Sequence, residues 1–495
     1  MKKLSVFGII ALMLVGLAAN AFAADIKATG KWQIEAQNRD NMDFNKSQEE
    51  NTFDIQQRVR TAFQFIANEN LKGVLDTQIG TAAWGNNALA IGSGRTPNVA
   101  TNYSGATVAG DGNIMLRQGY VDFKWPGTKV QFKVGYQTVG LPAAVGGGSA
   151  ILDDQVAAAV MVTPLTDNLK LLAGYARPYD SQAFGAASSS VGHGTSTDMV
   201  FAAVPIDFKG FNFTPFAAYG NSGYRTTTSV TTAGVVTYLG GSQTAGFAAP
   251  NATSNEGVRV YFGGLAATIT ALDNFTIKGD FNYGKATYNS GVNNIDAGRS
   301  GWLGDIAVDY TGLKMMTPSL FFVYSSGEDG NSSKNAKSER MPFLGNPQSW
   351  AVGSFFFGDR DFANGFSANN GYFSKTQGFW TAGLSLKDIT FLDKLKHTVH
   401  LLYIKGTNDK DFIKDNNAGN GYRAYGGILT EKDSLWEVDF NTKYMIYDEL
   451  SVYLNLGYIN QNYDKDLWRA SGQTNAATID PKDAYRVGLG VTYAF

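Results

Sequence analysis

The sequence predicts an all-β protein, a transmembrane antiparallel β-barrel of about eighteen strands, with sixteen as the alternative count. Three observations lead to this prediction. Apolar and polar side chains alternate along many segments, short and long connections alternate between these segments, and the composition is aromatic and glycine-rich but poor in charge. Alternation gives each strand one face for lipid and one for water.

The composition favours a barrel over soluble domains. The 495 residues include 24 Tyr, 32 Phe and 57 Gly but 12 Pro, and 17% are charged, against about 25% in an ordinary soluble protein. The formal net charge of −2 provides no strong field that would attract nucleic acid. The absence of cysteine excludes disulfides, thiolate metal sites and cysteine nucleophiles.

The N-terminus has the pattern of a secretory signal peptide. "MKK" is followed by the apolar run "LSVFGIIALMLVGLAA" and by "NAFA", where Ala21 and Ala23 form an A-x-A cleavage pattern. We therefore expect residues 1–23 to be removed and residues 24–495 to form the barrel domain. The run is short for a membrane span, and no later stretch reaches eighteen uninterrupted apolar residues. The mature chain is then either secreted or a β-barrel.

Strand-like alternation recurs to the last residue. The chain ends "YRVGLGVTYAF", in which alternate residues from Tyr485 to Phe495 are apolar. Alternation is weak in 198–220, where Pro215 interrupts it, and the apolar segment 350–359 is interpreted as a folded-back part of a loop. The expected strands lie near 26–37, 54–67, 71–83, 113–124, 129–138, 156–163, 169–177, 198–208, 211–220, 257–271, 275–286, 300–311, 317–325, 377–388, 396–406, 434–446, 450–461 and 484–495.

The connections indicate the compartment. Short turns such as 125–128, 164–168, 209–210, 272–274 and 447–450 alternate with long polar segments at 84–112, 178–196, 221–255, 327–376, 407–433 and 462–483. Tight periplasmic turns and long external loops are typical of outer-membrane barrels, and an even strand number places both termini in the periplasm. We expect the protein in the outer membrane of a Gram-negative bacterium, in contact with the lipid bilayer and lipopolysaccharide.

The alternation also predicts which side chains face inward. Arg58 and Arg60 lie opposite Phe63 and Phe65 on one strand. Arg117 shares the parity of outward-facing apolar residues, which either a β-bulge or a subunit contact would resolve. The other expected lumen charges are Lys31, Glu35, Lys133, Lys278, Asp280, Glu437, Asp439, Lys443 and Arg486. Their mixed signs predict weak ion selectivity.

Outward-facing aromatic residues are expected to form interfacial girdles. A sugar-binding aromatic slide is the alternative, and it would require these residues to face inward. They are Trp32, Trp302, Tyr310, Trp380, Trp436, Tyr493 and Phe495.

The sequence offers little for catalysis, and we expect no enzyme and no cofactor. The three histidines are His193, in a loop, and His397 and His400, whose odd spacing sends them to opposite faces of one strand. No G-x-S-x-G or P-loop motif is present. The oxygen-rich segment 408–421 could hold a structural Ca²⁺, although it lacks EF-hand spacing and a solvated loop is the alternative.

Two resemblances extend this interpretation. The final "YAF" resembles the C-terminal strand of Gram-negative outer-membrane proteins, which implies that Tyr493 and Phe495 form a signal for the assembly machinery. The motifs "DIQQRVRTAFQFIANENLKG", "LRQGYVDFKWPGTKVQFKVGYQTVGLP" and "ILDDQ", in their order from Asp25 to Phe495, resemble the homotrimeric porins of sulfate-reducing deltaproteobacteria. This implies a trimeric general diffusion channel for ions and small hydrophilic solutes. A substrate-selective channel and a structural or adhesive surface barrel are the alternatives.

The same resemblance implies a constriction. General porins fold a loop into the lumen after the fifth strand, and residues 137–155 stand at that position and end in Asp153 and Asp154. With Arg58 and Arg60 opposite these aspartates, the constriction would carry a transverse field. The alternative is that the arginines pair with nearby carboxylates such as Asp76 and only line a polar wall.

Overall fold

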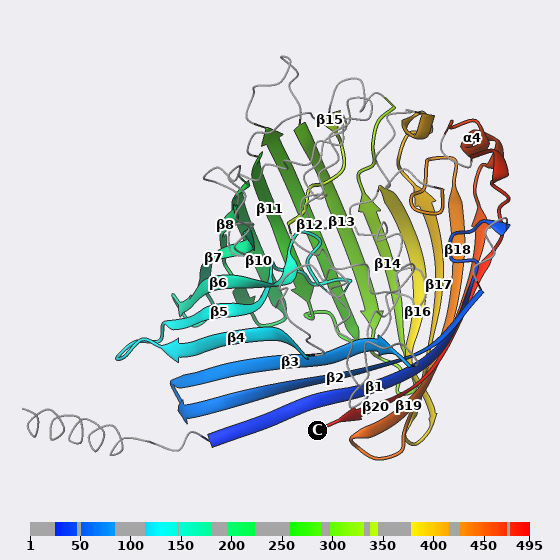
Figure 1. Cartoon of the computed structure of the whole chain (residues 1–495). Coiled ribbons are helices and arrows are strands. Elements are labelled where there is room, and N and C mark those ends of the chain that lie inside the picture. The colour runs from blue at the N-terminus through cyan, green and yellow to red at the C-terminus, as the bar shows by residue number, and fades with distance from the viewer. Residues whose placement is uncertain are drawn as a thin grey trace, which may run out of the picture.

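The computed structural model describes most of the chain, and Figure 1 shows a wide sheet that closes on itself. The described residues are 25–46, 51–84, 114–146, 148–180, 196–222, 258–288, 298–330, 337–344, 378–414, 425–472 and 476–495. The expected signal peptide at 1–23, the segment 350–359 and His193 lie outside these ranges.

Twenty strand segments form one sheet. They are β1 (Asp25–Asp40), β2 (Asn51–Asn68), β3 (Leu71–Ala83), β4 (Ile114–Lys124), β5 (Gln131–Gly140), β6 (Asp153–Pro164), β7 (Lys170–Asp180), β8 (Ser196–Ala203), β9 (Ile206–Phe208), β10 (Phe211–Ser222), β11 (Val258–Ile269), β12 (Phe275–Tyr288), β13 (Gly298–Tyr310), β14 (Thr317–Ser325), β15 (Lys337–Ser338), β16 (Phe379–Leu392), β17 (Leu395–Gly406), β18 (Ser434–Met445), β19 (Leu450–Asn462) and β20 (Ala484–Ala494).

Over the described residues, eighteen antiparallel strands make the barrel wall, as predicted, and the alternative of sixteen is wrong. Each strand pairs with its neighbour, and β1 pairs with β20 to close the barrel. Strand β9 continues β8 after a break at Val204 and Pro205, and both pair with β10. Strand β15 is a two-residue segment that pairs in parallel with β13 and is not a wall strand. Pro215 is accommodated within β10, where its carbonyl accepts a hydrogen bond from Val204 N.

The predicted facing of the last strand is confirmed. In β20, alternate residues from Tyr485 to Tyr493 are exposed on the outer surface, whereas Ala484 and Arg486 are buried. Phe495 completes the outward row and closes the seam of the barrel. Its backbone N–H donates to Gly30 O at 3.0 Å, and Gly30 N donates to Phe495 O at 2.7 Å.

Outward-facing aromatic rings form two levels on the barrel. Near the external ends, ring centroids lie 4.6 Å apart for Trp302 and Tyr324 and 4.8 Å apart for Tyr403 and Trp436. Near the periplasmic ends, Phe275 and Tyr310 lie 5.0 Å apart, and Tyr493 and Phe495 lie 5.6 Å apart. An apolar belt between two aromatic girdles is the surface of an outer-membrane barrel. These rings are therefore not an internal sugar slide.

A β-bulge resolves the facing of Arg117. The β3–β4 register passes from Asp76↔Gln118 to Thr77↔Leu116, so Arg117 is the extra residue. The bulge switches the parity of β4, and Leu116 before it and Val121 after it are both exposed on the outer surface. Arg117 points inward, with its guanidinium 3.4 Å from the Asp76 carboxylate.

Among the described residues, helical structure lies only in the connections. The described segments are η3 (Phe412–Lys414), α4 (Lys465–Arg469) and η5 (Ala476–Thr478). Within the described ranges, no helix is long and apolar enough to cross a membrane.

Candidate pore constriction

Residues 141–152 enter the barrel between β5 and β6. The β5–β6 ladder ends at Gly140↔Asp153, and Leu141 N donates to Leu152 O at 3.0 Å to close the loop. The tip reaches β12, where the N–H groups of Ala144 and Val145 donate to the two oxygens of Asp280 at 2.7 and 2.8 Å. Asp280 alternates with the exposed outward residues Phe281 and Tyr283, so it faces inward. The loop therefore lies inside the lumen.

The loop lies on an inner wall that is apolar. Ile151 and Leu152 are fully buried, and Ser149 Oγ accepts a hydrogen bond from Ile151 N at 3.1 Å. The buried apolar residues on the inward faces of β6 to β8 and β10 to β13 form what we call the apolar arc. Its buried members are Val156, Ala158, Ala176, Met199, Phe201, Ala203, Phe216, Ala218, Val258, Val260, Phe262, Ala286 and Leu303. The loop removes these side chains from lumen water, which is favourable because apolar surface is buried.

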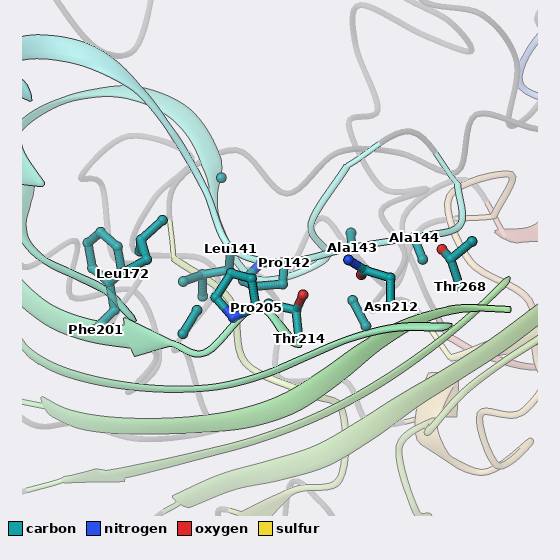
Figure 2. Close-up of a pocket in the computed structure, with 13 residues that line it drawn as sticks. Leu141, Pro142, Ala143, Ala144, Leu172, Phe201, Pro205, Asn212, Thr214 and Thr268 are labelled. Atoms are coloured by element: carbon teal, nitrogen blue, oxygen red, sulfur yellow. The ribbon is translucent and has the colours of Figure 1, made fainter. Parts of the chain in front are cut away.

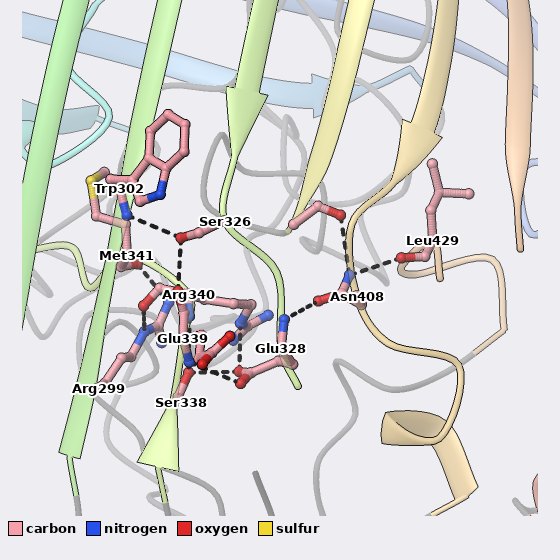
Figure 3. Close-up of polar contacts among 11 residues, drawn as sticks. Arg299, Trp302, Ser326, Glu328, Ser338, Glu339, Arg340, Met341, Asn408 and Leu429 are labelled. Carbon is pink, nitrogen blue, oxygen red and sulfur yellow. Dashed lines mark hydrogen bonds and ion pairs between the residues drawn. The ribbon is translucent and has the colours of Figure 1, made fainter. Parts of the chain in front are cut away.

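A second segment, residues 337–344, also lies inside the barrel, and we call it the inner strap (Figure 3). Arg299 faces inward on β13 and donates from Nε to Arg340 O at 3.0 Å and from Nη2 to Met341 O at 2.8 Å. Gly301 allows the close contact, because a Cβ there would lie 2.2 Å from Glu339 O. The strap ends on the first loop, where Leu344 N donates to Ile151 O at 2.7 Å.

A buried ion pair holds the strap. Arg340 Nε lies 3.0 Å from Glu328 Oε1, and the two side chains are 6% and 1% exposed. Ser338 Oγ donates to the same carboxylate at 2.6 Å. Glu328 N in turn donates to Asn408 Oδ1 at 2.9 Å, which links the strap to the next external connection (Figure 3). The sequence predicts only an external loop in 327–376, although "RMPF" at 340–343 places apolar residues in a polar segment.

Described residues of further external connections form a small folded core, which we call the external cap. It consists of residues 41–46, 407–414, 425–433, 463–472 and 476–481. The fully buried Trp468 donates from Nε1 to Asp433 at 3.0 Å, and Asp464 N donates to the other Asp433 oxygen at 2.8 Å. Burial raises the pKa of the Asp433 carboxyl. The cap covers the inward residues Val323, Phe379, Leu402, Ile404, Leu435, Ile459 and Ala484.

Another part of the wall is polar, and we call the inward face of β20 and β1 to β5 the polar arc. Arg58 Nη2 donates to Gln33 Oε1 at 2.9 Å. Arg60 Nε donates to Gln78 Oε1 at 2.7 Å. Both predicted arginines therefore face inward and contact amide side chains of neighbouring strands.

Two further predicted residues of the polar arc form a buried cluster. Arg486 Nη2 lies 2.7 Å from Glu35 Oε1, and Tyr453 Oη donates to Glu35 Oε2 at 2.8 Å. The half-buried Lys133 lies over the Tyr120 ring, 5.8 Å from its centroid. Lys31 is also half-buried on the inward face of β1.

The two predicted aspartates do not share a face. In β6, Asp154 alternates with the outward residues Ala157 and Ala159 and points inward, where it is 9% exposed. Asp153 is on the outward parity. A one-residue spacing on a strand separates the two carboxylates, so only Asp154 can contribute to an internal field.

The residues predicted on β18 differ in exposure. Glu437 and Asp439 face inward but are fully buried, whereas Lys443, near the periplasmic end, is exposed. Inward parity therefore predicts the face of a side chain but not its access to lumen water.

The two histidines of β17 face opposite sides, as predicted. His400 pairs with Ser385 across the strands, with 2.7 Å between Nδ1 and Oγ, and His397 stacks on Phe440 at 5.4 Å. Among the described residues, no cluster of three or more His, Asp or Glu could hold a metal ion. This covers 408–414 of the proposed Ca²⁺ segment, and 415–421 lie outside the described ranges.

Comparisons with known proteins give structural likeness only. No protein-family model matches the chain, and no curated protein matches it. The outer membrane protein OprD of Pseudomonas aeruginosa is similar with 16% identity and a TM-score of 0.49, covering 96% of this chain and 95% of that one. OccK11 (OpdR) of the same organism has 10% identity, a TM-score of 0.49 and coverages of 95% and 96%. OccAB4 of Acinetobacter baumannii has 12% identity, a TM-score of 0.48 and coverages of 96% and 99%.

Proposed function

We propose that this outer-membrane barrel is a diffusion channel that passes small hydrophilic solutes and ions along the polar arc. The observation that carries the proposal is the division of the inner wall. The apolar arc is covered by residues 141–152 and the inner strap, whereas the polar arc keeps half-exposed charged side chains inside the barrel. Solvent-accessible charge inside a barrel is typical of a water-filled channel.

Further accessible inward charges lie outside the polar arc, near the periplasmic ends of β12, β16 and β18. The side chains of Lys278 on β12 and Lys387 on β16 face inward and are each 37% exposed. Their Nζ atoms lie 3.6 and 2.9 Å from the Asp309 carboxylate. Lys31, Arg60 and Lys133 are half-buried, and Lys443 is exposed. Basic and acidic groups are interspersed, so we expect weak ion selectivity.

The constriction is proposed between the polar arc and residues 141–152. Arg58 and Arg60 on β2 would supply the positive side, and the inward Asp154 at the base of the loop would supply the negative side. Fixed charges beside a narrow water path bias which ions pass. Asp153 is omitted from this proposal because its side chain has outward parity.

We propose a homotrimer whose contact includes the external part of β5 to β8. Near their external ends, β7 and β8 carry the outward polar residues Arg177 and Asp198. Arg177 and Asp198 form an ion pair there at 2.7 Å. Polar side chains facing lipid are unfavourable, whereas a second copy would cover them. Arg177→Leu should leave the barrel folded and reduce the trimer fraction in mass photometry, and an unchanged fraction would exclude this contact.

Phe495 is proposed to be part of the assembly signal as well as of the seam. Deleting Phe495 removes both backbone hydrogen bonds to Gly30 and the ring that covers it. We expect unassembled, protease-sensitive chain in the periplasm, whereas normal yield of folded barrel from the truncated gene would contradict the proposal. Phe495→Tyr, which keeps an aromatic terminus, is the matched control.

Planar bilayer recording tests the function. Open channels that close in three equal steps would support a trimeric diffusion channel. Saturable block by one solute would support a substrate-selective channel, for which the pocket described below is the favouring observation. Purified, folded protein that never conducts would contradict both and favour a structural or adhesive barrel.

A further inference from the structure

A pocket of about 290 Å³ lies between residues 140–144 and the inner wall of the apolar arc (Figure 2). Its wall residues come from the periplasmic parts of β7, β8, β10 and β11, so the pocket lies toward the periplasmic end of the barrel. The lining residues are Gly140, Leu141, Pro142, Ala143, Ala144, Leu172, Phe201, Ala203, Pro205, Asn212, Thr214, Ala266 and Thr268.

The lining has an apolar body and a polar end. Leu141, Pro142, Leu172, Phe201 and Pro205 gather at one end of the pocket (Figure 2). The hydrogen-bonding side chains of Asn212 and Thr268 lie toward the other end, and that of Thr214 lies between the two ends, beside Pro205 (Figure 2). Small-molecule sites are typically mostly apolar, with a few polar groups that fix orientation.

None of the lining residues carries a charge. The nearby inward charges are already engaged. Asp207 accepts a hydrogen bond from the lining residue Asn212 and lies 3.8 Å from Lys170. Lys278, which pairs with Thr268 in the β11–β12 register, contacts Asp309 at 3.6 Å. Asp280, which pairs with Ala266, accepts the amides of the loop tip. A charged ligand would lose hydration in this pocket without gaining a partner from the lining, and this is costly.

We propose that the pocket binds an uncharged amphipathic solute, an aromatic or alicyclic ring with one amide or hydroxyl group. A cavity of about 150 Å³ holds benzene, so this pocket has room for a substituted ring. The ring would lie against Leu141 and Phe201, and its polar group would reach Asn212, Thr214 or Thr268. This proposal rests on the proposed channel function, because the solute reaches the pocket through the lumen.

Benzamide is a suitable probe, and benzoate is its nearly isosteric charged control. Equilibrium dialysis of radiolabelled benzamide against the folded protein in detergent measures binding without requiring conduction. We expect benzamide to bind saturably. Benzoate should bind more weakly by about tenfold or more, because its charge would lose hydration without gaining an ion-pair partner. In bilayers, benzamide should block the current over the same concentration range.

Three variants test the location. Thr214→Leu fills part of the pocket and removes a hydroxyl, so it should abolish saturable benzamide binding. Thr268→Val removes one hydroxyl at nearly constant shape and should weaken binding severalfold. Thr398→Val, on the inward face of β17 outside the pocket, is the matched control and should bind as the parent does. A difference in gel migration between unheated and heated samples verifies that each variant is folded.

The outcomes separate this proposal from the channel function. Absence of saturable benzamide binding to a folded, conducting protein overturns the pocket proposal and leaves the channel intact. Equal binding by Thr214→Leu, or benzoate binding as tight as benzamide binding, also overturns it. Saturable binding to a protein that never conducts supports the pocket and contradicts the channel.

Discussion

The two arcs of the inner wall have the same strand alternation, but their inward positions hold polar side chains in one arc and apolar side chains in the other. On β2, the inward positions hold Arg58 and Arg60, which contact the amides of neighbouring strands. On β8, the inward positions hold Met199, Phe201 and Ala203, which are covered from within the barrel. An inward position therefore has to be polar only where water reaches it. Residues 141–152 and the inner strap determine which inward positions are removed from lumen water.

The same comparison explains how the covering is anchored. The apolar arc is closed by contacts that residues 141–152 and the inner strap make with a few inward polar groups, chiefly Asp280 and Arg299. Asp280 accepts hydrogen bonds from backbone N–H groups of the loop, and Arg299 donates hydrogen bonds to backbone carbonyls of the inner strap. Removing these polar groups should expose the apolar arc, whereas equivalent changes on the polar arc should alter only its charge.

The largest effect is expected from Asp280→Ala. It removes two charge-assisted hydrogen bonds to the loop tip, each contributing about 1.5–3 kcal/mol. The tip should then leave β12 for part of the time, and single-channel recordings should show a larger conductance level with frequent transitions. Asp309→Asn, an inward carboxylate that contacts lysines instead of the loop, is the control. Parent-like recordings from Asp280→Ala would show that the loop is held by other contacts.

Glu328→Ala should release the inner strap. The change leaves Arg340 buried without its ion-pair partner, which typically costs about 3–5 kcal/mol. We expect trypsin to cleave the folded protein after Arg340 much faster than it cleaves the parent. Asp388→Ala breaks the exposed ion pair with Lys396 and should cost about 1 kcal/mol or less. Equal cleavage rates in the parent and Glu328→Ala would contradict the role of the buried pair.

The sequence predicts the barrel well because its signal is local. Alternation with a period of two places eighteen strands and their inward residues, and the misplaced parity of Arg117 points to the bulge that resolves it. The covering segments are not local. Ala144 and its acceptor Asp280 are 136 residues apart, and Glu328 and Asn408 are 80 apart. No periodicity in 327–376 indicates that residues 337–344 turn inward, and nothing local predicts that Glu437 and Asp439 are fully buried.

A smaller effect is expected on the polar arc. Replacing Arg58 and Arg60 by Ala removes two positive charges from the proposed constriction, where fixed charges would act strongly on passing ions. Cation preference should rise while conductance changes little or increases, and Asp154→Asn should shift the preference toward anions. Reversal potentials across a salt gradient measure both. Parent-like potentials in the double arginine variant would place these residues outside the constriction.

The smallest effect concerns the external cap and pH. Because burial raises the folded-state pKa of Asp433, the folded cap binds the proton more tightly than the open cap does. The stabilisation that this group contributes is present below the ordinary aspartate pKa and is lost as pH rises through the raised pKa. Amide exchange in 463–472, corrected for intrinsic rates, should therefore report a less stable cap as pH rises from acid. Asp433→Asn should flatten this dependence, and an unchanged profile would contradict the assignment.

The central claim is that lumen water reaches the polar arc and not the covered side chains of the apolar arc, and thiol accessibility tests it most directly. The chain has no cysteine, so single substitutions need no other change. We expect Lys133→Cys to react with a charged, membrane-impermeant methanethiosulfonate reagent and the channel current to fall as it does. Ala176→Cys, at a fully buried position of the apolar arc, should remain unmodified in the folded protein. Equal reaction at both positions, or reaction only at Ala176→Cys, would contradict the account.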